Sequence, residues 1–322
     1  MSITLSCAFA TSSLSHEHAR IAEDLGYARA WFYDSPALYP DIWVQMCRAA
    51  ERTTRIGLGT GVLIPSLRHP MVNAAAIATL VSLAGESRVT IGIGSGFTGR
   101  LTMGQRPLKW SFVREYIQTL KALLRGEAVE WEGKMMQMMH PEGFGASRPI
   151  NVPMIVAAAG PKGFAVAHEL ADGVLATGGP VSGFKWSIAL TFGTILEDGE
   201  SPGSDRAIAA AGHGAAVWLH AAVEGLFGAS IPNGELWAAA YADVPERVRH
   251  IALHDKHLIA VNERDRPFVT GELLAQVGAA LNRAGWRDRI AAIEANGYTE
   301  IAYQPAGPDI PGELERFAEA AR

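Results

Sequence analysis

Hydrophobic positions along this 322-residue chain follow two alternating patterns. Short apolar runs are typical of buried strands, and apolar residues spaced three or four apart are typical of amphipathic helices. The two patterns alternate from one end of the chain to the other, which predicts eight strands that are each followed by a helix. Strands are expected at 3–9, 28–34, 55–62, 88–96, 153–159, 173–177, within 207–219 and at 299–305. Helices are expected at 16–26, 41–52, 70–84, 109–125, 161–171, near 182–197, at 271–296 and at 311–321.

The order of these elements indicates the fold class. Strands joined by helical crossovers form parallel sheets with right-handed connections. Eight such units in a chain of this length favour an α/β fold of the closed (β/α)8, TIM-like barrel type. An open parallel sheet is the alternative, because closure is not visible in one sequence. We expect one barrel domain over 1–322, with a polar, charged insertion at about 230–270 before the last helix–strand unit.

Composition narrows the class of protein. With 48% hydrophobic and 19% charged residues, the chain can bury a large core. The net charge is −5 and no long basic run occurs, so nucleic acid is not an expected partner. Two cysteines, Cys7 and Cys47, are too few for a disulfide framework and suit a reducing, cytoplasmic setting. No apolar run is long enough to predict a membrane span. A small-molecule substrate is therefore the expected partner.

Three predicted strand ends carry mostly small residues. In a (β/α)8 barrel the active site lies at the C-terminal ends of the strands, and here these ends read LGTG, GIGSG and VAAAG. Glycine within a strand marks a bulge, a tight corner or the close approach of a ligand. The three ends together predict a smooth floor with room for a flat ring system. Tight packing between strands is the alternative interpretation.

The segment GSGFTG, residues 94–99, matches the G-x-G-x-x-G dinucleotide fingerprint, with Glu115 about twenty residues further on. That fingerprint normally lies in the first βαβ unit and leads directly into its helix. Here it follows the fourth predicted strand and runs into a loop that contains a proline. We therefore do not expect a Rossmann-type NAD site.

A sharp Gly-Pro turn lies within VAAAGPKGFAVAHELADGVLATGG, residues 156–179. It separates a predicted strand from a helix, so free backbone N–H groups at the helix start lie beside Lys162. Such groups suit an anionic ligand. An ordinary strand-to-helix turn is the alternative for Lys162.

Several segments, taken in order, resemble the luciferase-like monooxygenase superfamily: LGTGVLIPSLRHP, NAAAIATLVSL, GIGSG and IVAAAGPKGFAVAHELADGVLATGG. The resemblance covers most of 1–180 and resumes near TEIAYQPAGPDI. It is closest to members that use the deazaflavin coenzyme F420, such as glucose-6-phosphate dehydrogenases and methylenetetrahydromethanopterin reductases of that type. It implies a TIM-like barrel with the flavin or deazaflavin ring across its strand ends, and a homodimer.

The resemblance also implies roles for particular residues. The family's third strand ends in a non-prolyl cis peptide that forms a bulge behind the ring, and by position this is Gly61–Val62. Gly57 and Gly59 are then left to barrel packing. Asp34 matches an acidic position at the cofactor in the deazaflavin branch, where flavin monooxygenases more often have Glu-His-His. The remaining implied cofactor contacts are Gly94, Ser95, Gly96, Ala157, Ala158, Ala159, Gly160, Thr177, Gly178 and Gly179, to which the turn above adds Lys162.

Two departures from the family pattern bear on the substrate. Sugar-phosphate dehydrogenases of this type have a histidine after the aspartate and a glutamate in the fourth-strand loop as acid and base. The chain has Ser35 and Phe97 there, so a sugar phosphate is not favoured. Asp34 or solvent is left to handle the proton. We expect an F420-dependent oxidoreductase that moves a hydride between deazaflavin C5 and a small organic substrate. The alternatives are an FMN-dependent monooxygenase and a non-catalytic flavin-binding protein.

Histidines also cluster in the last third of the chain. His250, His254 and His257 are expected on one face of a helix, where a solvated face or a lid lining is preferred to a metal site for want of carboxylate partners. No metal is expected. His213 and His220 are expected to flank the seventh strand. The charged segment VNERDRPF, 261–268, is expected to form a loop that could cover the barrel mouth.

Overall fold

A closed barrel of eight parallel strands forms the centre of the molecule. The computed structural model describes residues 3–223 and 234–322. Each strand pairs with its neighbours in the order β1-β12-β9-β8-β7-β4-β3-β2, and β2 pairs back to β1. The barrel strands are β1 (Thr4–Phe9), β2 (Arg29–Phe32), β3 (Gly57–Leu63), β4 (Val89–Gly94), β7 (Met154–Ala157), β8 (Gly173–Ala176), β9 (Ser187–Phe192) and β12 (Glu300–Gln304). The predicted α/β, TIM-like fold is confirmed.

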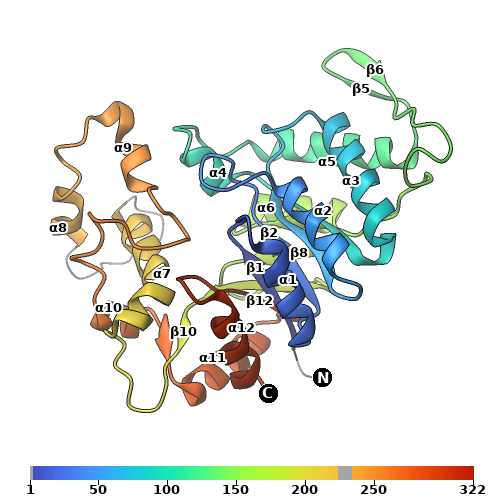
Figure 1. The fold of residues 1–322 in the computed structure, drawn as a ribbon. Coiled ribbons are helices and arrows are strands. Elements are labelled where there is room, and N and C mark those ends of the chain that lie inside the picture. The colour runs from blue at the N-terminus through green and yellow to red at the C-terminus, as the bar shows by residue number, and fades with distance from the viewer. Residues whose placement is uncertain (1–2, 224–233) are drawn as a thin grey trace.

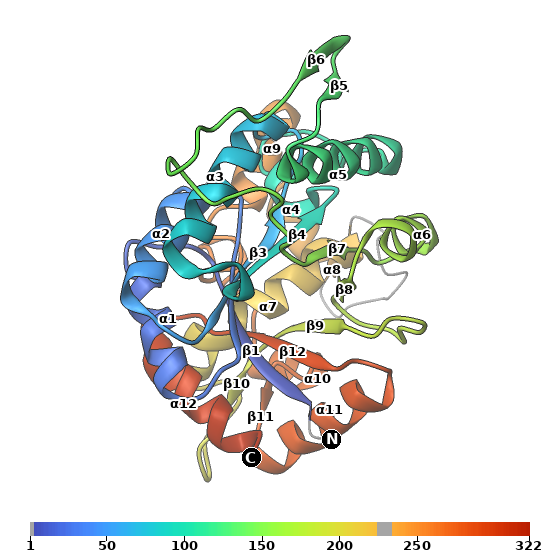
Figure 2. The same cartoon turned by 90° about the vertical axis from the view of Figure 1, so that its right-hand side faces the viewer.

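Helices surround this barrel on the outside, as Figure 2 shows. Several begin where their sequences predict: the Asp41 carboxylate accepts hydrogen bonds at the start of the second helix, and Pro70 occupies the first turn of the third. The outer helices are α1 (Ser15–Asp24), α2 (Ile42–Arg52), α3 (Pro70–Ala84), α5 (Trp110–Arg125), α6 (Pro161–Leu170), α11 (Arg283–Ala295) and α12 (Ile310–Ala320). Shorter elements are the 3-10 turn at Glu86–Arg88, α4 (Phe97–Leu101) and the antiparallel hairpin of β5 (Val129–Trp131) and β6 (Lys134–Met136). Among the described residues, no helix combines the length and hydropathy that crossing a bilayer requires.

Trp31 fills much of the barrel interior. Its side chain is fully buried, and its indole N–H donates to Ser6 Oγ and Glu300 Oε1. A Cβ at Gly59 on the neighbouring strand would lie 2.3 Å from the Trp31 ring. A Cβ at Gly57 would meet Arg29 at 3.2 Å. The two glycines therefore serve barrel packing, as expected from the sequence.

The predicted seventh strand is wrong. The barrel strand is β9, within the range expected to form a helix at 182–197, and the range 207–219 lies in the helix α7 (Asp205–Val223). The run SIALTF of β9 is rich in β-branched and aromatic residues, which fit a buried strand. The first part of α7 is mostly alanine, the strongest helix former. His213 and His220 consequently lie on a helix instead of flanking a strand.

The insertion before the last helix–strand unit is larger than predicted. It begins at β10 (Thr194–Ile195) and continues through α7 to β11 (Ala280–Leu281), which pairs with β10. Its other helices are α8 (Gly234–Ala239), α9 (Glu246–Leu253) and α10 (Gly271–Gln276). The helix expected at 271–296 is thus two helices, α10 and α11, separated by β11. Side chains of α7, α8, α10 and β11 share an apolar cluster of their own, and α7 to α10 gather at one side of the barrel (Figure 1).

Candidate active site

The expected cofactor residues lie at the C-terminal ends of five strands that are consecutive in the barrel. These strands are β2, β3, β4, β7 and β8, and because all are parallel their C-terminal ends share one rim. Gly94 pairs with Ala157 across β4 and β7, and Ala157 pairs with Leu175 on β8. The structure therefore brings the expected residues to one side of one barrel mouth.

The third strand has the expected bulge. The Gly61–Val62 peptide bond is cis, and the register between β3 and β4 shifts between Thr60 and Leu63. Val62 packs against β4 at the position of Gly94, where an added Cβ would lie 2.7 Å from Val62 Cγ2. Gly94 thus leaves the space that the bulged strand fills.

Beyond β4, Gly96 has a positive φ of 79° and forms the N-cap of α4. The G-x-G-x-x-G segment therefore leads into a helix of only five residues, on the fourth barrel strand. Its last glycine, Gly99, lies against the end of β2, where an added Cβ would meet Ser35 Oγ at 3.1 Å and the Asp34 carbonyl at 3.2 Å. The segment packs the rim and is not a dinucleotide fingerprint.

Asp34 is buried at the end of β2 and paired with a cation. Both of its carboxylate oxygens accept from Arg68 Nη1, at 2.8 and 2.7 Å. Arg68 also donates to Asp41 Oδ2 at 2.7 Å, so one guanidinium joins two carboxylates. Burial raises the pKa of Asp34, and the contact with Arg68 offsets part of that rise. The Arg68 backbone carbonyl in turn accepts from the Tyr116 hydroxyl.

The ends of β7 and β8 expose small residues and backbone. Ala159, Thr177, Gly178 and Gly179 are exposed, and an added Cβ at Gly178 or Gly179 would have no neighbour within 4 Å. Gly160 is the N-cap of α6 and no side chain caps this helix. Lys162 lies exposed in the first turn. This part of the rim offers unfilled backbone donors and one cation to a ligand.

Part of the insertion crosses the other side of the mouth. The Tyr39 hydroxyl donates to the His257 carbonyl at 2.7 Å, and Gln304 Nε2 donates to the Leu258 carbonyl at 2.7 Å. Gln304 Oε1 accepts from the Tyr33 hydroxyl at 2.9 Å. Because these partners end or follow β2 and β12, the segment 257–258 lies over the barrel. The segment 261–268, expected as the cover, instead contributes the buried Asp265 to the interior of the insertion.

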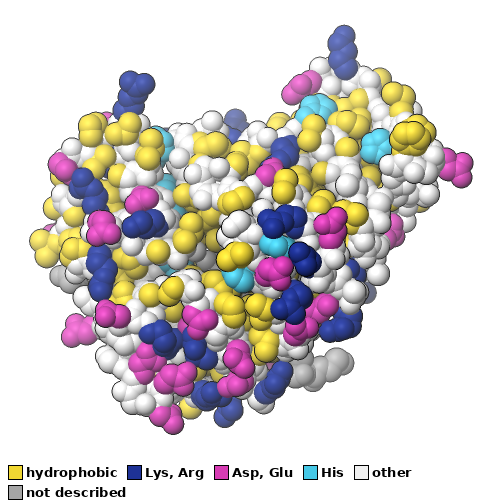
Figure 3. Space-filling view, in the orientation of Figure 1, with side chains coloured by type: hydrophobic (Ala, Val, Ile, Leu, Met, Phe, Trp, Pro, Cys, Tyr) yellow, Lys and Arg dark blue, Asp and Glu magenta, His cyan; other side chains and the backbone are white. Residues whose placement is uncertain are grey.

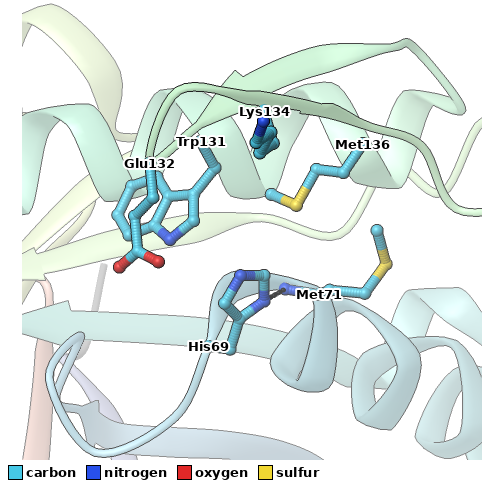
Figure 4. Close-up of a pocket in the computed structure, with 6 residues that line it drawn as sticks. All are labelled: His69, Met71, Trp131, Glu132, Lys134 and Met136. Carbon is cyan, nitrogen blue, oxygen red and sulfur yellow. Dashed lines mark hydrogen bonds between the residues drawn. The ribbon is translucent and has the colours of Figure 1, made fainter.

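A separate hollow of about 370 Å³ is shown in Figure 4. It separates the β5–β6 hairpin from the start of α3, and its lining residues are His69, Met71, Trp131, Glu132, Lys134 and Met136. None of the expected cofactor residues lines it, and the His69 Nδ1 atom is occupied by the Met71 N–H. We therefore place the candidate active site at the barrel mouth.

On the face shown in Figure 3, acidic and basic side chains are interspersed.

Comparison with known families identifies the protein family, which the geometry of the site alone leaves open. The luciferase-like monooxygenase family matches residues 15–302. The chain belongs to this family. The expected resemblance is therefore confirmed, and it extends through the insertion to the last barrel strand.

Curated relatives are similar over about half of the chain. A 5,10-methylenetetrahydromethanopterin reductase from Archaeoglobus fulgidus is 30% identical over 163 residues, 49% of this chain and 47% of that protein. An F420-dependent glucose-6-phosphate dehydrogenase from Beutenbergia cavernae is 39% identical over 142 residues, 41% of this chain and 40% of that protein. The match thus spans less than half of the length of either relative.

Solved structures are similar over the full length. The F420-dependent tetrahydromethanopterin reductase from Methanopyrus kandleri superposes with a TM-score of 0.68 at 20% identity, covering 99% of this chain and 98% of that one. The FMN-containing oxygenating component of a type II Baeyer–Villiger monooxygenase from Pseudomonas putida gives 0.62 at 12% identity, covering 100% and 98%. These likenesses show a shared fold.

Three residues of the mouth were missed by reasoning from sequence. Arg68 neutralises Asp34. The Tyr33 hydroxyl donates to Gln304 at the end of β12, and the Tyr39 hydroxyl connects the insertion to the barrel. Tyr33 directly precedes Asp34, so its position at a strand end was a usable signal. Arg68 lies in a loop 34 residues away from its partner, and no local pattern marks it.

Proposed function

We propose that the chain is an F420-dependent oxidoreductase that transfers a hydride between deazaflavin C5 and a small organic substrate. One observation carries the proposal: the β-bulge at the end of β3, where the register with β4 shifts between Thr60 and Leu63, lies at the small-residue rim of β4, β7 and β8. The curated relatives named for F420 support the choice of cofactor. When bound, F420 would supply a two-electron carrier at C5.

The residues present fit such a group. Val62, Ser95 and Ala157 are only partly buried at the rim, so the floor formed by the strand ends is accessible to a flat ring. The exposed backbone of Gly178 and Gly179 and the uncapped start of α6 would hold the polar tail. Lys162 would pair with its phosphate, since helix N-termini and cations both favour anions.

Asp34 is the catalytic residue that we propose. Its raised pKa suits a group that holds a proton, while Arg68 fixes the orientation of its carboxylate. Ser35 and Phe97 stand where sugar-phosphate dehydrogenases of this family have their acid and base. We therefore propose a substrate other than a sugar phosphate. Asp34→Asn should keep a hydrogen bond to Arg68 but lower turnover. Full turnover in this variant would assign the proton to another group or to solvent.

Cofactor titration tests the proposal. The purified protein is titrated with F420 and, separately, with FMN, and quenching of cofactor fluorescence is followed. We expect saturable F420 binding with FMN weaker by about 100-fold, or about 2.7 kcal/mol. Lys162→Ala should weaken F420 binding, whereas Lys134→Ala, on β6 and outside the expected cofactor residues, should not.

The reverse preference would place the chain among the FMN-dependent monooxygenases and make oxygen consumption the next assay. The likeness to the FMN-containing Baeyer–Villiger structure makes this the second candidate. If the protein binds neither F420 nor FMN, the proposed ring site at the rim is refuted, and a protein without flavin or deazaflavin chemistry is favoured.

A further inference from the structure

Three histidines, two of them buried and the third partly buried, meet in the insertion, outside the site described above. They are His220 on α7, His254 directly after α9, and His257 in the following turn. One ring nitrogen of each lies within 4.8 Å of the others. The expectation that His250 would join His254 and His257 on one helix face is wrong, because α9 ends at Leu253. His220, which lies 34 residues before His254 in the chain, takes the place of His250.

Asp265 fixes the orientation of His220. The His220 Nε2 atom lies 3.1 Å from Asp265 Oδ2. The same carboxylate accepts from Trp237 Nε1 at 2.7 Å, from the Tyr241 hydroxyl at 2.8 Å and from Asn262 Nδ2 at 2.9 Å. Burial favours protonation of Asp265, but these donors outweigh it and lower its pKa, so the group is a carboxylate.

A carboxylate can only accept, so His220 Nε2 carries the proton and, in the neutral ring, Nδ1 carries the lone pair. That Nδ1 atom is buried without a hydrogen-bond partner among the described residues, and so is His254 Nδ1. His220 is 6% exposed and His254 is 7% exposed, so water does not readily supply the missing partners. A carboxylate behind one ring nitrogen and an unpartnered lone pair on the other is the arrangement that metal-binding histidines share.

Burial disfavours protonation of two members of the cluster, His254 and His257. Burial, with the neighbouring His220 and His250, lowers the pKa of His254 to about 4. Burial, with His254 and His220, lowers the pKa of His257 well below its usual value. Metal binding requires deprotonated imidazoles, so the lowered pKa values of His254 and His257 are consistent with the geometry.

The backbone around His257 is unusual. Lys256 and Leu258 both have positive φ, at 57° and 61°. Non-glycine residues adopt this conformation infrequently, and it is found where a surrounding structure demands it. The two residues hold His257 between them, and the segment is also tied to the barrel mouth by Tyr39 and Gln304.

We propose that His220, His254 and His257 form a three-histidine binding site for a divalent first-row transition metal ion such as Zn²⁺. Zn²⁺ accepts imidazole ligands at about 2.0–2.1 Å and commonly takes three of them with a fourth position left for water or substrate. Tetrahedral coordination places such nitrogens about 3.4 Å apart, so the rings need only a small closure. The metal would join α7 to the segment that crosses the mouth.

Metal titration of the full chain, free of any affinity tag, tests the site. After treatment with a chelator and its removal, the protein is titrated with Zn²⁺ by calorimetry and with Co²⁺ by visible absorption. We expect one ion per chain and the intense bands of tetrahedral Co²⁺. His254→Gln and His257→Gln should each abolish the bands, and Asp265→Asn should weaken Zn²⁺ binding by about 10–100-fold.

His250→Gln is the matched control, since it removes a histidine of the same segment that lies outside the trio. It should bind Zn²⁺ as the parent does. Circular dichroism of each variant identifies any that fails to fold, and His254→Gln and His257→Gln leave the Asp265 network intact. Absence of saturable binding in the folded parent would overturn the proposal. So would binding that persists in both folded ligand variants or that is lost equally in His250→Gln.

Discussion

The Asp34 carboxylate and the Arg68 guanidinium form the central charge pair of the candidate active site. Their side chains are 2% and 14% exposed, so both charges are largely removed from water. Asp34 was expected at the site because it ends a predicted strand. Arg68 was not, because ion pairing depends on which loops meet in space, and β2 and β3 bring their loops together only once the two strands have paired.

Arg68→Met should leave Asp34 as an uncompensated buried charge. We expect the free energy of unfolding at neutral pH to fall by about 3–5 kcal/mol. Without the cation, the pKa of Asp34 rises further above its unfolded value, so the folded state binds more protons than the unfolded state and stability decreases as the pH rises through that window. The deficit should therefore shrink as the pH is lowered. Denaturant unfolding from acidic to neutral pH measures it.

The Asp34→Asn, Arg68→Met double variant supplies the control for this effect. With no carboxylate at position 34, it should recover most of the pH-dependent part of the loss. A deficit that is the same at acidic and neutral pH, or that persists in the double variant, would show that Arg68 acts through packing instead of charge.

At the scale of elements, hydrophobic periodicity was sufficient to place the strands and helices where the chain follows simple strand–helix units. Strands β1 to β4 and their helices lie close to the predicted ranges, because each combines a buried apolar run with a helix that starts at a capping residue or proline or ends at a glycine of positive φ. It failed at the seventh unit, where β9 is followed by a long insertion. An insertion interrupts the alternation on which the prediction relied, and the strand was assigned to the next apolar run, which is α7.

The packing of β3 against β4 at the bulge also belongs to the scale of elements. Gly94→Ala should destabilise the protein by about 1–3 kcal/mol, because its Cβ would lie 2.7 Å from Val62 Cγ2. Val62→Ala removes that atom and should rescue Gly94→Ala. Unfolding of the parent, both single variants and the double variant gives the coupling between the positions, which we expect to exceed about 0.5 kcal/mol. Additive effects would mean that Val62 does not occupy the space left by Gly94.

For the whole molecule, the insertion and the barrel meet at the mouth through a few backbone carbonyls. The sequence located the insertion approximately and pointed to 261–268 as a loop that could cover the mouth. The structure turns Asp265 of that segment inward, where it finds four buried donors, and leaves 257–258 across the mouth. The buried position of Asp265 depends on hydrogen-bond donors from α7, α8 and the loop after α8. These donors are far from Asp265 in the sequence, so no local pattern predicts that they meet.

Tyr39→Phe tests this connection between insertion and barrel. Loss of the hydroxyl that donates to the His257 carbonyl should lower the free energy of unfolding by about 0.5–1.5 kcal/mol and speed amide hydrogen exchange around 254–260. Tyr27→Phe is the matched control: its hydroxyl donates to the Leu314 carbonyl at 2.7 Å, before β2 and so at the opposite end of the barrel. It should cost a similar free energy and leave exchange at 254–260 unchanged. If both variants speed that exchange equally, the segment responds to global stability, and the Tyr39 hydroxyl is not what holds it over the mouth.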